Sequence, residues 1–274
     1  MLDRIGKLIE ADKLVLPVFD QIALRIRELP ADKNCLVSEI EQLITNDQAL
    51  AVEVLRAANS PFYCGLSTIR TIRNAIVRLG VDQVTRLVCL ASQHSKYKAR
   101  DVQLTAMLQE LWSHSSTTAL AAHWLAKRLH SEEIEEECFL GGLLHDIGKI
   151  LILRAIDEIN HLDGRRIVVS PPLIQEVLIA AHTKLGHDLL RRWNIPEVYC
   201  QIALSHHEDE FDGADLTLAI VRLANDASRK IGTGLDPDKT LVLASTPEAH
   251  GLKISDIVLA ELEVMLEDHL GLPI

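Results

Sequence analysis

The most informative segment of the sequence is GGLLHDIGKI, residues 141–150. Here the adjacent pair His145 and Asp146 stands among leucines and isoleucines, and Lys149 follows His145 by about one helical turn. Buried charged groups cost a large free energy unless they are paired or bound to a metal, so this pair requires partners. On a helix the two adjacent side chains diverge by about 100°, yet both can reach an ion at that edge. The segment therefore predicts a metal-binding helix, with Asp146 and Lys149 as candidate catalytic residues.

Further histidines come from other predicted helices, either on an apolar face or at a helix end. Together with Asp146 they form a set rich in imidazole and poor in carboxylate, which suits iron, manganese, nickel or zinc better than calcium. The set predicts a site for one or two divalent transition ions. The alternative is a group of buried histidines that only hydrogen-bond to one another. The candidate metal ligands are His114, His145, Asp146, His182, His206 and His207.

Helical periodicity extends along nearly the whole chain, because apolar residues recur at steps of three and four. Strand-like alternation is nearly absent, so the sequence predicts an all-α fold. Only His94 of the twelve histidines precedes residue 100. We expect an N-terminal helical subdomain over 1–100 and a helical bundle with the His/Asp set over 101–274. The predicted helices cover about 2–10, 19–29, 38–46, 47–58, 71–80, 81–93, 104–129, 131–153, 172–194, 196–208, 214–232 and 255–270.

The order of the histidine motifs resembles the HD superfamily of metal-dependent phosphohydrolases, near its HD-GYP branch. Three N-terminal segments resemble the HDOD family, the HD-related output domain of bacterial signalling proteins. These segments are LPVFDQIALRIREL (16–29), ITNDQALAVEVLRAANSPFY (44–63) and TIRNAIVRLGVDQV (71–84). The resemblance covers almost the whole chain. It implies a helical HD-like bundle with an additional N-terminal helical subdomain, the two together forming one HDOD unit.

Two functions follow from this resemblance. HDOD proteins typically act as non-catalytic regulatory modules, which implies bacterial signalling through a protein partner or a small phosphorylated ligand. Catalytic HD proteins hold one to three metals that activate water against a phosphoester. The resemblance to these catalytic proteins implies an alternative function, that of a metal-dependent phosphohydrolase or phosphodiesterase that acts on a nucleotide or another phosphoester. In that case Lys149 would steady the phosphate oxygens.

Two departures from the HD pattern bear on catalysis. The segment AIVRLANDAS (219–228) places Asn225 where a final metal-binding aspartate belongs, and Asp226 is rotated about 100° away. The amide oxygen of Asn225 remains a candidate ligand, although it brings no charge. After His207 the chain reads DEFDGADL (209–216), where HD-GYP proteins have Gly-Tyr-Pro. The second departure argues against hydrolysis of cyclic dinucleotides.

The composition narrows the class of partner. The formal net charge is −11 and no block of basic residues offsets it, so we expect no nucleic-acid partner. No segment approaches the 18 or so apolar residues of a membrane helix, so we expect no membrane association. The five scattered cysteines include no Cys-x-x-Cys pair, which is typical of reduced thiols in a cytoplasmic protein. The oligomeric state is not encoded in these patterns.

Overall fold

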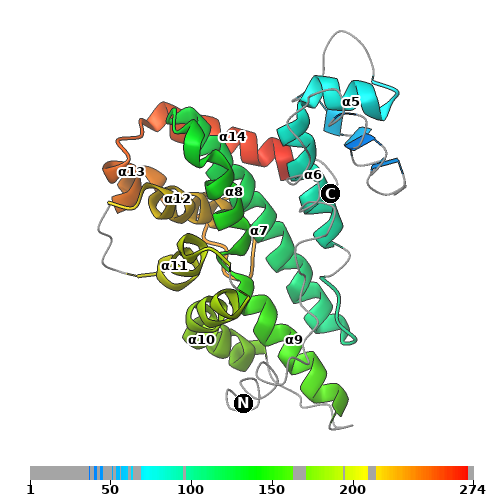
Figure 1. Cartoon of the computed structure of the whole chain (residues 1–274). Coiled ribbons are helices and arrows are strands. Elements are labelled where there is room, and N and C mark those ends of the chain that lie inside the picture. The colour runs from blue at the N-terminus through cyan, green and yellow to red at the C-terminus, as the bar shows by residue number, and fades with distance from the viewer. Residues whose placement is uncertain are drawn as a thin grey trace. The chain divides into compact units, whose positions relative to one another are not determined.

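A computed structural model (Figure 1) describes residues 69–94, 97–162, 171–193, 195–208 and 214–270, together with isolated residues between 37 and 63. Every regular element in these ranges is a helix, so the predicted all-α class is confirmed. The helices expected over 2–10 and 19–29, and with them residues 1–36 of the expected 1–100 subdomain, lie outside the described residues.

The described part of the chain divides into two compact units, of which the first ends at Tyr97. This unit contains α5 (Ile72–Leu79) and α6 (Val81–His94). Asn59 is hydrogen-bonded to the chain just before α5, because its side chain donates to the carbonyl oxygen of Ile69 and accepts from the Ile69 amide, at 2.9 and 2.8 Å. Asn59 therefore has a structural role. The apolar core of this unit contains Ile40, Ile44, Val54, Ala58, Ile72, Ala75, Ile76 and Val84.

The second unit runs from Lys98 to His269 and carries the histidine motifs. Its long helix α7 packs against α8, α9 and α12, while α10 packs against α9 and α11 (Figure 1). Alanines and leucines of α7 and α12 provide much of its apolar core. Its elements are α7 (Val102–Arg128), η1 (Glu132–Ile134), α8 (Glu135–Leu144), α9 (Ile147–Leu162), α10 (Pro171–Arg192), α11 (Glu197–Ser205), α12 (Leu216–Lys230), η2 (Leu243–Ser245), α13 (Pro247–Gly251) and α14 (Asp256–Leu270).

Most predicted helices of this unit agree with the structure to within a few residues. The structure adds η2 and α13, for which the sequence analysis predicted nothing. Both are short, and short helices leave little periodicity to recognise. Among the described residues, no helix combines the length and the apolar character needed to cross a bilayer.

The continuous helix predicted over 131–153 is wrong. The helix α8 ends at Leu144 and α9 begins at Ile147, so that His145 and Asp146 lie in a turn between them. The cause is packing, because α8 lies against α7 and α12 whereas α9 lies along α10. A Cβ atom at Gly148 would collide with the carbonyl oxygen of His182, so only glycine permits this approach of α9 to α10. In this turn the two side chains lie close together, with His145 Nε2 3.4 Å from Asp146 Oδ2.

Candidate metal centre

The predicted ligands come from separate helices and converge on the carboxylate of Asp146. This carboxylate is fully buried, and the imidazoles around it are 1–3% exposed apart from His207, which is exposed. Asn225 is 4% exposed. The contributions are His114 from α7, His145 and Asp146 from the α8–α9 turn, Lys149 from α9, His182 from α10, His206 and His207 from the end of α11, and Asn225 from α12.

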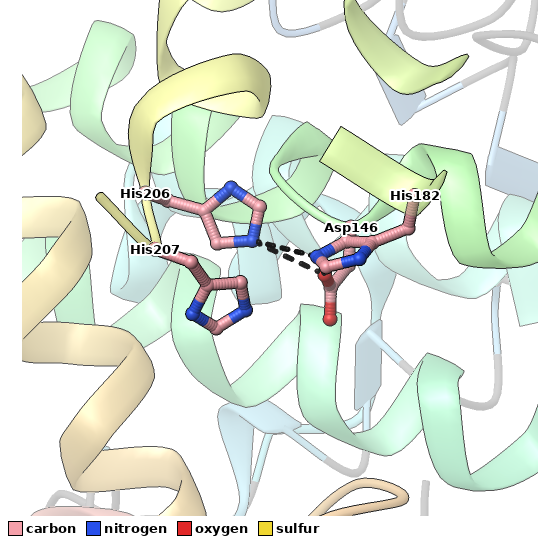
Figure 2. A group of neighbouring side chains, drawn as sticks. All are labelled: Asp146, His182, His206 and His207. Carbon is pink, nitrogen blue, oxygen red and sulfur yellow. Dashed lines mark hydrogen bonds and ion pairs between the residues drawn. The ribbon is translucent and has the colours of Figure 1, made fainter. Parts of the chain in front are cut away.

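One oxygen of the carboxylate faces the histidines of α10 and α11. Asp146 Oδ1 lies 3.5 Å from His182 Nε2 and 3.4 Å from His206 Nε2. Figure 2 shows these rings and that of His207 gathered around Asp146. Oδ1 is buried and has no hydrogen-bond partner in the structure. An unsatisfied buried carboxylate oxygen is costly, so this atom requires a cation that the side chains do not supply.

The other oxygen faces a different group. Asp146 Oδ2 lies 2.7 Å from Lys149 Nζ, 3.4 Å from His145 Nε2 and 3.6 Å from His114 Nε2. His114 Nε2 also lies 3.2 Å from His145 Nε2 and 3.0 Å from Asn225 Oδ1. The predicted ligands thus form two adjacent groups of donor atoms that share one carboxylate.

The histidine rings are oriented by backbone carbonyl groups one turn earlier in the chain. The Nδ1 atoms lie 2.7 Å from such an oxygen in His145 and in His182, and 3.1 Å in His206. A carbonyl oxygen only accepts, so each Nδ1 carries the hydrogen and each Nε2 directs a lone pair into the cluster. Metal-binding histidines have this arrangement, in which the second ring nitrogen donates to a carbonyl or carboxylate.

The charge states of these groups also suit a metal ion. Burial lowers the pKa of His114 to about 3 and that of His182 to about 4, and it lowers the pKa of His206 as well. Burial by itself would raise the pKa of Asp146, but Lys149 and the neighbouring imidazoles hold it well below its usual value. At neutral pH His114, His182 and His206 are therefore neutral and Asp146 is ionised, which are the forms that bind metals.

The spacing of the donor atoms fits an ion of this kind. Ligands at about 2.0–2.2 Å from a tetrahedral ion stand about 3.4 Å from one another. The separations that join Asp146, His182 and His206, and those that join Asp146, His114, His145 and Asn225, lie between 3.0 and 3.6 Å. The ligand atom of His207 lies within 4.8 Å of those of Asp146, His182 and His206. The two sets that could hold an ion are Asp146 with His182, His206 and His207, and Asp146 with His114 and His145.

A pocket of about 550 Å³ opens above the cluster. His114, Asp146, His182 and Asn225 contribute to it. A small molecule in this pocket would therefore be in reach of the carboxylate and of any ion bound there. Its other polar lining residues are Lys149, Gln175, Thr183, His207, Glu208, Arg229, Thr233 and Asp236, and its apolar ones are Leu111, Leu178, Ile179, Leu204 and Leu235.

The loop after α12 also contributes to the site, although no residue of it was predicted to do so. Thr233 Oγ1 lies 3.4 Å from His114 Nδ1 and donates its own hydrogen to the carbonyl oxygen of Ser228 at 2.8 Å. The next residue, Gly234, has a φ of +90°, and a Cβ atom there would lie 3.1 Å from His114 Cγ. The signal in the sequence was the pair of glycines in the segment IGTG (231–234), at the end of the helix predicted over 214–232.

An all-helical chain with buried histidines around an adjacent His-Asp pair has the characteristics of an HD-type protein. The HDOD domain model matches residues 16–209, which is more than half of the chain, and the chain belongs to the HDOD domain family. The predicted family is thereby confirmed. Asn225 and the loop around Thr233 lie beyond the matched residues.

An uncharacterized protein of Treponema pallidum (strain Nichols) is 23% identical over 198 residues, which are 70% of this chain and 37% of that protein. The chain thus spans little more than a third of the length of this curated relative. An HDOD domain protein of unknown function from Geobacter sulfurreducens has a TM-score of 0.71 and 23% identity, with 99% of this chain and 96% of that chain covered.

Two further solved structures share the fold. A candidate metal-dependent phosphohydrolase from Shewanella amazonensis SB2B has a TM-score of 0.66 and 16% identity, with 96% and 95% of the two chains covered. A candidate signal transduction protein from Marinobacter aquaeolei VT8 has a TM-score of 0.62 and 19% identity, with 98% of this chain and 64% of that chain covered. At these identities the likeness shows the fold alone.

Proposed function

We propose that this chain is a regulatory HDOD protein of a bacterial signalling system, in which the histidine cluster binds a divalent transition ion at the base of a ligand pocket. The observation that carries the proposal is the buried Asp146 Oδ1, which has two imidazole nitrogens at 3.4–3.5 Å and no hydrogen bond. A cation at this position would satisfy the oxygen and the lone pairs of both rings. Iron, manganese, nickel and zinc suit such a donor set.

The regulatory role is supported by the composition of the cluster and by the structural neighbours. Asp146 is the single carboxylate in both donor sets of the described residues, and Asn225 stands where catalytic HD proteins are expected to place another. One solved neighbour is described as a candidate signal transduction protein. In this role a small phosphorylated ligand would occupy the pocket, and binding would be transmitted to a protein partner.

A second function, hydrolysis of a phosphoester, is favoured by Lys149. Its side chain is 16% exposed and lines the pocket, where the ammonium group would stabilise negative charge on a phosphate. A bound divalent ion would lower the pKa of a water molecule and would activate the phosphoester as a Lewis acid. The candidate metal-dependent phosphohydrolase among the neighbours has the same fold.

The metal content of purified protein, combined with phosphate release, tests both functions. We expect near-stoichiometric iron, manganese, nickel or zinc, because burial and ring orientation already prepare the donor atoms. The double variant His145→Ala/Asp146→Ala should lose this metal, and its far-UV circular dichroism should remain helical. Phosphate release from a panel of nucleotides and an aryl phosphate should stay at the level of the double variant if the role is regulatory.

Each outcome decides between these functions. Metal-free protein from metal-replete cells would contradict the metal centre. Turnover that disappears in the double variant would replace the regulatory function with the phosphohydrolase. Turnover of equal size in both proteins would come from a contaminant and would leave the regulatory function in place.

A further inference from the structure

The two oxygens of Asp146 differ in the charge that already stands beside them. Oδ1 faces only neutral donors, which are His182, His206 and the exposed His207. Oδ2 has the ammonium group of Lys149 at 2.7 Å, a distance typical of a charge-assisted hydrogen bond. A cation therefore occupies the Oδ2 side before any metal binds, and the Oδ1 side has none.

A dication at Oδ2 would be strongly repelled. It would sit about 2 Å from the oxygen whose other neighbour, Lys149 Nζ, is 2.7 Å away. Repulsion between a dication and an ammonium group at such a separation is large in a buried site, where the effective dielectric constant is low. The favourable position for an ion is consequently on the opposite side of the carboxylate.

Asn225 makes binding of a dication at Oδ2 still less favourable. Its neutral amide oxygen lies 3.0 Å from His114 Nε2 and adds no negative charge. The neighbouring carboxylate, Asp226, is directed to Arg229 instead, with 3.5 Å between its oxygen and the guanidinium. The positive charge of Lys149 already neutralises the negative charge of Asp146. Each bound dication would therefore add two positive charges, and the donor sets contain no other carboxylate to compensate them. A second ion would be much less favourable than the first.

We infer that this chain binds a single divalent ion at Asp146 Oδ1 with His182, His206 and His207, and that the ammonium group of Lys149 takes the place of a second ion at Oδ2. This inference rests on the metal centre proposed above and specifies where its ion lies. His114, His145 and Asn225 then form a hydrogen-bonded group beside the ion. His207 is exposed and lines the pocket, so the ion would be accessible from the pocket.

Titration of metal-free full-length protein with Co²⁺ tests this assignment, by calorimetry for stoichiometry and by visible absorption for coordination. We expect one ion per chain in the unaltered protein. His206→Gln should lower the affinity on the order of 100-fold or more, because loss of a group that merely orients a ligand already costs about 10- to 100-fold. His114→Gln should lower it by less than about tenfold and should preserve the visible spectrum. His187→Gln, on the same helix as His182, is the matched control.

A gain-of-binding variant keeps the test independent of folding defects. The double variant Lys149→Met/Asn225→Asp removes the ammonium group and adds a carboxylate on the Oδ2 side, and it should bind two Co²⁺ ions. Thermal unfolding of every variant, followed by circular dichroism, verifies that each one is folded.

The possible failures are distinct. Absence of Co²⁺ binding in the unaltered protein would contradict the proposed metal centre and this inference together. Two ions per unaltered chain, or loss of binding in His114→Gln with retention in His206→Gln, would overturn the inference and leave the metal centre standing. If folded Lys149→Met/Asn225→Asp protein still binds only one ion, the role of Lys149 in excluding a second ion is wrong.

Discussion

Asp146 illustrates how much a single residue depends on its surroundings. Its side chain is fully buried, yet Lys149 at 2.7 Å keeps it ionised. A buried ion pair of this kind contributes little net stability, because desolvation offsets the attraction. The pair instead keeps the ionised oxygen Oδ1 of Asp146 beside the imidazoles of His182 and His206. The pair therefore serves the site more than it serves the fold.

Gly234 is a residue whose small size protects the position of His114. We expect Gly234→Ala to lower the free energy of unfolding by at least about 1 kcal/mol more than Gly232→Ala, measured by urea denaturation. Both glycines have positive φ, at +90° and +98°, so an alanine is strained at either position. A Cβ atom at Gly234 also meets the His114 ring at 3.1–3.2 Å, whereas at Gly232 it meets the flexible end of Lys239. Equal losses in the two variants would contradict a steric role of Gly234.

At the scale of elements, a clamp between α11, α12 and α13 holds the His206–His207 turn. Arg222 of α12 donates to the carbonyl oxygens of Ser205 and Glu208 at 3.0 and 2.8 Å, and these two residues flank the histidine pair. The same guanidinium forms an ion pair with Glu248 of α13, which is 3% exposed. Arginine can serve all three acceptors because its planar group carries five donors.

Removal of this clamp should weaken the metal centre although Arg222 does not touch it. We expect the double variant Arg222→Gln/Glu248→Gln to lower Co²⁺ affinity about 10- to 100-fold, as for other groups that orient metal ligands. The paired change avoids leaving a buried carboxylate unpaired. Calorimetry and the visible Co²⁺ spectrum measure the effect, and the spectrum should change because the histidine turn moves.

The matched control is Arg128→Gln, which removes a half-exposed pair in which Nε and Nη2 of Arg128 both donate to Glu261 Oε2. Exposed ion pairs contribute about 0–1 kcal/mol, so this variant should keep both affinity and spectrum. An Arg222→Gln/Glu248→Gln protein with unaltered affinity would refute the clamp.

At the scale of the whole molecule, metal binding and folding of the second unit should be coupled. The candidate ligands come from α7, the α8–α9 turn, α10 and the end of α11, which are separated in the sequence, so the site exists only when these elements are packed. An ion at 100 times its dissociation constant should therefore raise the free energy of unfolding by about 2.7 kcal/mol. Thermal unfolding with and without a chelator measures this, and His145→Ala/Asp146→Ala should show no shift. A chelator-insensitive midpoint in metal-loaded protein would contradict the coupling.

The sequence by itself determined the all-α class, the HDOD family and the residues that gather around Asp146. Helical periodicity is a local property, so it indicates α7 or α12 without knowledge of their neighbours. Buried polar residues also reveal themselves locally, because His114 and His182 stand on apolar faces where an unsatisfied imidazole would be costly.

Only the tertiary structure decided how these residues are arranged. The break at His145–Asp146 arises because α8 packs mainly against α7 and α12 whereas α9 packs mainly against α10, and no local pattern encodes that choice. The contact of Thr233 with His114 joins residues 119 positions apart, and the clamp from Arg222 joins three helices. The difference between the two oxygens of Asp146 likewise depends on distances of a few ångströms across helices. Packing sets such distances, whereas periodicity sets only which face of each helix is buried.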